Sequence, residues 1–306
     1  MPSFRRWIIP VAVVAAAGFA TFWWLTQPTI ITTAELPNHT GDVVNGEVLF
    51  HAGGCASCHA APGAKGDTKK ILSGGLALKT PFGTFLAPNI SADPTAGIGS
   101  WSITDFINAM VRGVSPDGRH YYPAFPYTSY QRMSLVDLID LRAYMATLPA
   151  DATPSKIHQL SFPFTVRRGL GLWKFLYLDG AKFQPNPGAS VQVNRGAYLV
   201  EGPGHCGECH TPRSALGGLD RQNWLAGGPA PEGDGKIPNI TPHKDGLAKW
   251  SLSDIAYALE SGFTPDFDAF GGAMVSVQEN IAQLPKSDRE AIAAYLKAIP
   301  AISTKK

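Results

Sequence analysis

The stretch Cys55-Ala56-Ser57-Cys58-His59 decides how this chain folds, and its spacing returns in Cys206-Gly207-Glu208-Cys209-His210. Two cysteines three positions apart, followed at once by a histidine, form the attachment signature of a c-type haem. The cysteines form thioethers with the haem vinyl groups, and a ring nitrogen of the histidine binds the iron. The sequence therefore predicts two covalent haems, attached at Cys55, Cys58, Cys206 and Cys209 and ligated by His59 and His210.

Two other uses of a Cys-x-x-Cys pair have to be weighed against haem attachment, a zinc site and a thioredoxin-like redox centre. A zinc site needs four ligands close together, whereas these two pairs lie about 150 residues apart. A redox pair does not require the trailing histidine. All four cysteines of the chain belong to the two motifs, so none is left for a structural disulfide or a thiol nucleophile.

The haem motifs are part of a longer internal repeat. Pro88-Asn89-Ile90 returns as Pro238-Asn239-Ile240, and Trp101-Ser102-Ile103 returns as Trp250-Ser251-Leu252. In both copies the order is a short helix, the haem motif, a loop, a helix that follows a tryptophan, a second loop and a terminal helix. This order predicts an all-α chain with two tandem haem domains.

The helix ends carry their own signals. The expected caps are Ser102 or Thr104 and Gly113 in the first copy, and Ser251 or Ser253 and Gly262 in the second. Pro285 is expected to open the terminal helix of the second copy. No stretch shows the alternating pattern of a strand, and the 32 glycines and 25 prolines fit long loops.

In this layout the chain resembles class I c-type cytochromes. The resemblance implies that a methionine from the loop before the terminal helix completes the iron coordination and raises the redox potential. Met274 occupies that place in the second copy. The matching segment of the first copy, residues 122–127, carries Phe125, which cannot ligate iron.

The second ligand of the first iron therefore has three alternatives, Met110, Met133 and His120, besides an empty position. We favour Met110, because it lies nine residues after Trp101 on the helix that packs on the distal haem face in class I cytochromes.

The same resemblance implies contacts to the haem propionates. The predicted contacts are Trp101 and Trp250, through their indole N–H groups, and Asn89 and Asn239. The alternative for the tryptophans is plain core packing. Pro88 and Pro238 can offer backbone carbonyls to the proximal histidines, which would fix the tautomer of each ring.

The N-terminus predicts a membrane anchor over residues 1–26. Residues 7–26 are an uncharged, mostly apolar run of 20 residues, long enough to cross the hydrocarbon core of about 30 Å. Arg5 and Arg6 precede the run, which favours a cytoplasmic N-terminus and places the haem domains in the periplasm of a bacterium. A signal peptide cleaved near Ala20 is the rival interpretation.

The remaining boundaries follow from these elements. We expect a polar tether over residues 27–40, the first haem domain over 41–150, a linker over 151–190 and the second haem domain over 191–306. The linker is interpreted as a strap along both domains, with a docking surface as the alternative. The net charge of +2 gives no basic stripe for nucleic acid.

After the anchor, almost the whole chain resembles the membrane-anchored cytochrome c subunits of bacterial periplasmic dehydrogenases. The resemblance includes Asp117-Gly118-Arg119-His120, the Phe-Pro segment at residues 162–164 and His210-Thr211-Pro212-Arg213. It implies that a flavin or molybdenum dehydrogenase reduces one haem and that an oxidase, quinone or soluble cytochrome removes the electron. Many members of that family carry three haems, whereas this chain has two motifs.

An electron carrier needs no catalytic acid or base, and we assign no catalytic residue. The rival class is a dihaem enzyme, either a peroxidase that uses a vacant first iron or a thiosulfate-oxidising protein. A peroxidase requires a distal acid–base group, and a thiosulfate-oxidising relative usually has a cysteine or histidine as distal ligand. No cysteine remains here for that role.

Overall fold

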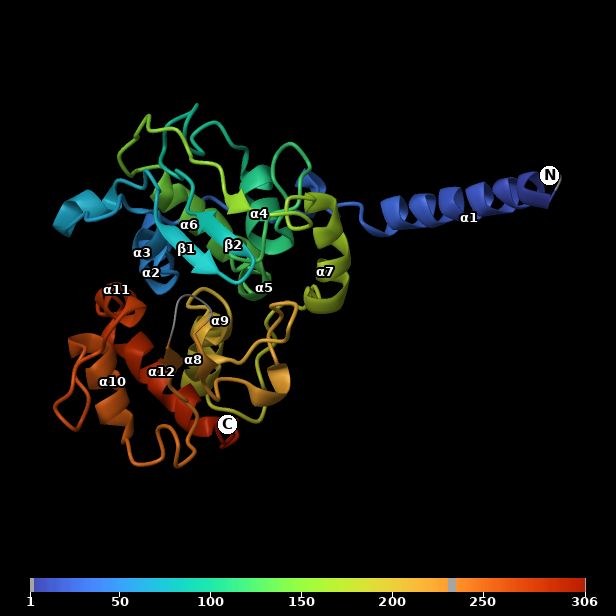
Figure 1. The fold of residues 1–306 in the computed structure, drawn as a ribbon. Coiled ribbons are helices and arrows are strands. Elements are labelled where there is room, and N and C mark those ends of the chain that lie inside the picture. The colour runs from blue at the N-terminus through green and yellow to red at the C-terminus, as the bar shows by residue number, and fades with distance from the viewer. Residues whose placement is uncertain (1–2, 231–234, 306) are drawn as a thin grey trace.

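One long helix projects from a mostly helical body in the computed structural model, which describes residues 3–230 and 235–305 (Figure 1). The projecting helix, α1, covers Ser3–Leu25. Within it, Ile8–Leu25 has a mean hydropathy of 2.0, and none of this stretch is buried. The predicted N-terminal apolar helix is therefore present, and by length and composition it is able to cross a membrane.

The N-terminal half of the body, residues 41–150, surrounds one hydrophobic core. Its helices are α2 (Val43–Ala52), α3 (Cys55–His59), α4 (Ile103–Arg112), α5 (Tyr127–Tyr130) and α6 (Leu135–Met145). Helix α2 packs on α6, and α4 packs on both α5 and α6. The side chains of Leu49, Ile107 and Leu138 meet in the centre and are completely buried.

The C-terminal half, residues 191–305, repeats this arrangement around a second core. Its helices are α8 (Val191–Glu201), α9 (Gly207–His210), α10 (Leu252–Ser261), α11 (Ala273–Ile281) and α12 (Lys286–Ala298). Helix α8 packs on α12 as α2 packs on α6. Leu199, Val200 and Ala293 form the centre of this core, and Figure 1 shows the two halves stacked against each other.

The sequence repeat is visible in how the paired helices cross. A Cβ atom on Gly46 of α2 would lie 2.1 Å from the carbonyl oxygen of Asp140 in α6. A Cβ atom on Gly196 of α8 would lie 1.9 Å from the carbonyl oxygen of Ala291 in α12. Any side chain at these two glycines would push the helices apart, so the close crossing is a property of both copies.

The predicted helix caps are confirmed. Ser102 caps α4, since its hydroxyl accepts a hydrogen bond from the Asp105 N–H at 3.1 Å, and Gly113 ends α4 with φ of 58°. Ser251 caps α10 in the same way, and Gly262 ends that helix with φ of 78°. The positive φ angles explain the glycines, because other residues reach this conformation only at a cost.

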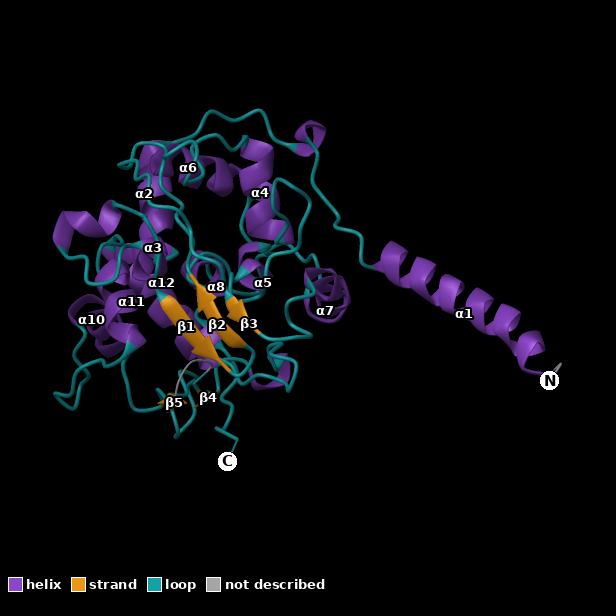
Figure 2. Ribbon diagram, turned by 45° about the horizontal axis from the view of Figure 1, so that its top comes forward, coloured by secondary structure: helices purple, strands orange, loops and turns teal. Residues whose placement is uncertain are grey.

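The all-α prediction is wrong in one respect, because the structure contains short strands (Figure 2). They form an antiparallel sheet of β1 (Ala77–Thr80), β2 (Gly83–Leu86) and β3 (Gln159–Leu160), and a hairpin of β4 (Gly228–Pro229) and β5 (Lys236–Ile237). With two to four residues each, these strands are too short for an alternating pattern to be recognised in the sequence.

The segments outside the two halves are fixed to them. In residues 27–40, the backbone of Ile31 pairs with the side-chain amide of Asn108 on α4, at 2.7 and 2.9 Å. In residues 151–190, β3 pairs with β2 of the N-terminal half, and helix α7 (Leu170–Tyr177) follows. Short 3-10 helices complete the fold at Thr33–Glu35, Gly66–Lys70, Arg167–Gly169 and Arg221–Asn223.

The close helix crossing predicts that Gly46→Ala and Gly196→Ala each destabilise the protein, because a methyl group cannot fit against the facing carbonyl oxygen. We expect a loss of about 1–3 kcal/mol in the free energy of unfolding, measured by chemical denaturation. Gly169→Ala is the matched control, since a Cβ there meets no atom within 4 Å. Equal stability of the Gly46→Ala and Gly169→Ala variants would contradict this packing.

A second prediction concerns Asp140, which holds the start of α2 against α6. Its carboxylate accepts hydrogen bonds from the Asp42 N–H at 2.7 Å, from Asn45 Nδ2 at 2.8 Å and from His39 Nε2 at 2.6 Å. Burial alone would raise the pKa of Asp140, but these hydrogen bonds outweigh burial and hold the pKa below its usual range.

Because the folded pKa of Asp140 is lowered, its stabilising effect is complete above the unfolded pKa of about 4 and is lost as the pH falls through the folded pKa. Wild type should therefore be more stable than Asp140→Asn at pH 7, and the difference should shrink toward pH 3. Thermal unfolding of both proteins across this range measures it. A difference that does not change with pH would exclude an ionised carboxylate as its cause.

Candidate haem sites

The first haem motif forms its own short helix, α3, which begins at Cys55 and ends at His59. The Nδ1 atom of His59 lies 2.8 Å from the carbonyl oxygen of Pro88. A carbonyl oxygen only accepts, so Nδ1 carries the proton and Nε2 keeps its lone pair. Burial lowers the pKa of His59, which favours the neutral ring that metal ligation requires.

The second motif repeats this geometry on α9. His210 Nδ1 lies 2.9 Å from the carbonyl oxygen of Pro238, and burial lowers the pKa of His210. The predicted contacts from the two prolines are thus confirmed. Each motif presents two thiol side chains one helical turn apart, followed by an imidazole whose Nε2 lone pair is available to bind iron. Two thiols for attachment and one imidazole nitrogen for ligation fit a covalently attached haem.

The structure gives Asn89 and Asn239 a role other than the predicted one. Asn89 Nδ2 donates to the carbonyl oxygens of Asp151 and Thr153 at 2.8 and 2.9 Å. Asn239 Nδ2 donates to the carbonyl oxygen of Ile302 at 2.7 Å. Both asparagines therefore tie down the chain that follows a terminal helix. In both residues these bonds use the side-chain amide hydrogens, and the contacts to the propionates remain predictions.

Trp101 and Trp250 lie half-buried at the edges of the two cores. Their equivalent positions agree with the repeat, and their predicted hydrogen bonds to propionates remain predictions.

The candidates for the second axial ligand lie in different surroundings. Met110 on α4 is 7% exposed and belongs to the N-terminal core. Met133 is 2% exposed, and its Cγ lies 3.6 Å from the Cβ position of Gly202 in the other half. Met274 is half-buried in the first turn of α11. The structure thus keeps Met110 within its own half and directs Met133 toward the neighbouring one.

His120 is the candidate that the geometry disfavours. Its Nε2 lies 2.9 Å from the carbonyl oxygen of Thr26, and its Nδ1 lies 3.0 Å from Lys174 Nζ. Both ring nitrogens are engaged where α1 meets the body, so ligation of iron through either nitrogen would require its hydrogen bond to break.

The third residue of the first motif makes a contact that the sequence did not predict. Ser57 Oγ donates to the carbonyl oxygen of Ser276 at 3.1 Å and accepts from Asn280 Nδ2 at 2.9 Å. Both partners lie on α11, in the C-terminal half. Lys69 and Glu279 form an ion pair beside this contact.

The third residue of the second motif makes the reciprocal contact. Glu208 is 7% exposed, and its Oε1 accepts hydrogen bonds from Thr128 Oγ1 at 2.6 Å and from Ser129 Oγ at 2.9 Å. Both donors lie on α5, in the N-terminal half. Arg213 pairs with the other carboxylate oxygen at 2.7 Å. Burial would raise the pKa of Glu208, but Arg213 and the two hydroxyl groups hold it below its usual range.

The two contacts are equivalent, because α5 and α11 each precede the terminal helix of their own half. Figure 1 shows α11 beside α2 and α3, and α5 beside α9. Each haem motif therefore rests on the short helix of the opposite half. The only sequence signal is that Ser57 and Glu208 share one position of the motif, and spacing alone does not reveal their partners.

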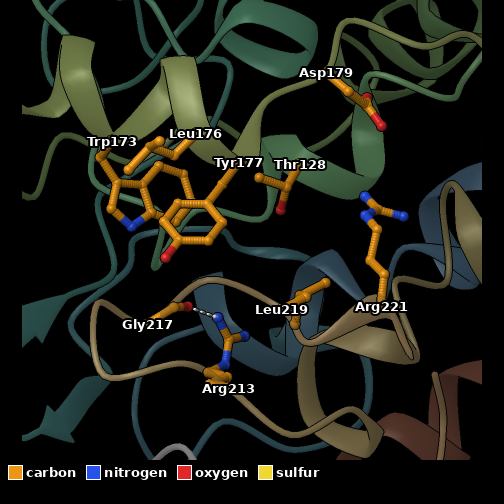
Figure 3. A pocket seen from close by; sticks show the side chains of 9 residues that line it. All are labelled: Thr128, Trp173, Leu176, Tyr177, Asp179, Arg213, Gly217, Leu219 and Arg221. Carbon is orange, nitrogen blue, oxygen red and sulfur yellow. Dashed lines mark hydrogen bonds between the residues drawn. The ribbon is translucent and has the colours of Figure 1, made fainter. Parts of the chain in front are cut away.

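Arg213 also borders a cavity of about 330 Å³ between α7 and the loop that follows α9 (Figure 3). Trp173 Nε1 donates to the carbonyl oxygen of Leu216 at 2.8 Å, and the Tyr177 and Ser214 hydroxyl groups lie 2.9 Å apart. One face of α7 is thus fixed to the loop after the second motif.

The buried carboxylate predicts a marked effect of Glu208→Gln. Glutamine retains the shape but removes the charge opposite Arg213, so we expect a loss of about 1.5–3 kcal/mol in the free energy of unfolding. Glu279→Gln is the matched control, because Glu279 pairs with Lys69 at the exposed edge of the other contact and should cost less than about 1 kcal/mol. Equal losses in chemical denaturation would show that Glu208 has no special role.

Comparison with known proteins agrees with this geometry. The cytochrome c family matches residues 43–149. A Cereibacter sphaeroides protein named diheme cytochrome c-type is 52% identical over 292 residues, which is 95% of this chain and 97% of the relative.

Longer relatives match over part of their length. The fructose dehydrogenase cytochrome subunit of Gluconobacter japonicus is 37% identical, over 90% of this chain and 56% of the relative. The gluconate 2-dehydrogenase cytochrome c subunit of Pantoea cypripedii is 37% identical, over 85% of this chain and 60% of the relative.

The full-length similarity to a dihaem relative and the two haem motifs lead to one conclusion. The protein carries two covalently bound haems c. The chain belongs to the family of dihaem c-type cytochromes.

Proposed function

We propose that this protein transfers electrons from a periplasmic dehydrogenase to the respiratory chain through one haem in each half. The observation that carries the proposal is the pair of haem motifs, whose helices α3 and α9 each rest on the opposite half. Each bound haem supplies one-electron redox chemistry, while the protein fixes its position and surroundings.

The residues have the following roles in this proposal. In the first haem domain, residues 41–150, Cys55 and Cys58 attach the haem, His59 ligates the iron, and Met110 is the second ligand. In the second, residues 191–306, Cys206, Cys209, His210 and Met274 have the same roles. The prolyl carbonyl oxygens bound to Nδ1 orient both histidine rings.

A short path of protein atoms connects the two motifs. His205, next to Cys206, lies with its Nε2 3.2 Å from the carbonyl oxygen of Gly53, two residues before Cys55. The ring of Tyr130 meets the ring of His205 edge-on, at 5.6 Å between centroids. These contacts hold the attachment helices close together, which favours electron exchange within one molecule.

The partner is inferred from the relatives, several of which are named as cytochrome subunits of fructose, alcohol and gluconate dehydrogenases. We infer that a flavin or molybdenum dehydrogenase reduces this protein. An oxidase, a quinone or a soluble cytochrome then accepts the electron.

The proposed location is the outer face of a bacterial cytoplasmic membrane, with α1 as a retained anchor. Arg168 joins the end of α1 to the body, because its Nε donates to Thr26 Oγ1 at 2.7 Å and its guanidinium lies 4.2 Å from the centre of a Trp23 ring. These contacts give the end of α1 a defined place on the body. Retention is favoured because cleavage near Ala20 would keep this contact but leave the exposed Trp23 and Trp24 at a new N-terminus without the rest of the apolar run.

Electron paramagnetic resonance of the oxidised protein tests the ligand assignment. Wild type should show two low-spin irons, and Met110→Leu and Met274→Leu should each convert one of them to a high-spin form. Met133→Leu is the control, since this equally buried methionine should leave both signals unchanged. An unchanged first-haem signal in Met110→Leu would remove Met110 as the ligand.

The same preparation separates a carrier from an enzyme. A carrier should show no turnover of hydrogen peroxide or thiosulfate by itself. A high-spin component in wild type together with peroxide turnover would favour the dihaem enzyme instead.

A further inference from the structure

Helix α7 lies on the side of the body from which α1 emerges, and it runs across the direction of α1 (Figure 1). Figure 2 gives the same placement from a second direction. Helix α7 contacts the residue that follows α1, because a Cβ atom on Gly171 in the first turn of α7 would lie 2.6 Å from Thr26 Cα. Thr26 is completely buried in this contact.

The face of α7 that meets Thr26 carries apolar side chains into the open. Phe175 follows Gly171 by four positions and therefore lies on the same face, one turn further along. Phe175 is 79% exposed, and the neighbouring Leu172 is 42% exposed. An aromatic and an aliphatic side chain exposed together on one helix face indicate an interaction surface.

Other side chains of α7 hold the helix to the body. Lys174 is 8% exposed, and its Nζ donates to the carbonyl oxygens of Arg112 and Gly113 at 2.7 Å each. Trp173 and Tyr177 face the loop after the second haem motif (Figure 3). Helix α7 is thus fixed to both halves, and its apolar outer face has no such partner among the described residues.

The surroundings of this face fit a lipid surface. At the end of α1, Trp23 is 50% and Trp24 is 70% exposed, and tryptophans at the end of a span lie at headgroup depth. Phe162, before α7, is 82% exposed. Residues 152–178 contain three basic residues besides the buried Lys174, namely Lys156, Arg167 and Arg168, and no acidic one. Apolar, aromatic and basic residues together are typical of segments that bind anionic lipid surfaces.

The short distance between α7 and the end of the membrane span favours lipid over a protein as the partner of this face. Thr26 lies two residues beyond Trp24, or about 3 Å along the helix axis. A helix with its side chains is about 10–12 Å wide, so a face of α7 turned toward the membrane reaches the headgroups. A dehydrogenase would have to displace lipid from the base of the anchor to cover this face.

We propose that α7 lies in the headgroup layer of the outer leaflet, with Phe175 and Leu172 inserted toward the acyl chains. The proposal rests on the proposed role of α1 as a retained anchor. Since α7 is fixed to both halves, this second attachment sets the orientation of both haem sites relative to the membrane. The body is then held at a defined angle instead of swinging on a single anchor.

Spin labelling of the full-length protein tests the proposal. Phe175→Cys is labelled in nanodiscs of phosphatidylethanolamine and phosphatidylglycerol, with the protein reduced so that the irons do not relax the label. Phe267→Cys is the matched control, because Phe267 is 95% exposed in the loop between α10 and α11. Collision with oxygen, which concentrates in lipid, is compared with collision with a water-soluble nickel complex.

We expect the ratio of oxygen to nickel collisions to be several-fold higher at position 175 than at position 267. Equal ratios would overturn the membrane placement of α7. A label at position 175 that becomes shielded from both reagents only when a dehydrogenase is added would also overturn it, because the face would then bind protein.

The nanodisc experiment tests the retained anchor and the placement of α7 separately. A wild-type protein that does not remain with the nanodiscs, or that is cleaved near Ala20 by mass spectrometry, overturns the anchor and the placement of α7 together. A protein that stays in the nanodiscs with a water-exposed label at position 175 overturns the placement of α7 alone.

Discussion

The hydrogen bonds made by Ser57 and Glu208 are the constraint on which the arrangement of the two haem sites depends. Each residue lies between the cysteines of a haem motif and bonds to the short helix of the opposite half, α11 or α5. Because α3 and α9 also carry the attachment cysteines and the proximal histidines, the contact that joins the halves fixes both sites relative to each other. In the proposed function, this arrangement lets one electron pass between the two sites without a separate interface domain.

The sequence predicted what depends on short spacing. The haem motifs, the caps of α4 and α10 and the prolyl carbonyls facing His59 and His210 all follow from residues close together or from the repeat. The missed features depend on partners far along the chain. Glu208 and Thr128 are 80 residues apart, and no local pattern reveals that a charged residue will be buried there with three donors.

The segment between the two halves also makes contacts that sequence spacing does not reveal. Residues 151–190 were expected to be a strap, and α7 within them meets the end of α1, the end of α4 and the loop after α9. Asn89 is a second example, because its amide secures the chain after α6 through a residue 62 positions away. In both cases the decisive fact is which backbone groups need a hydrogen-bonding partner, and only the fold reveals it.

In the proposed function, one chain passes an electron between two haem sites held together by its own contacts. Laser-flash reduction measures this directly, by injecting less than one electron per molecule and following redistribution between the two haems. Because transfer occurs within one molecule, we expect a redistribution rate that does not change with protein concentration. A rate that rises in proportion to concentration would show that electrons move only between molecules, and would contradict the claim.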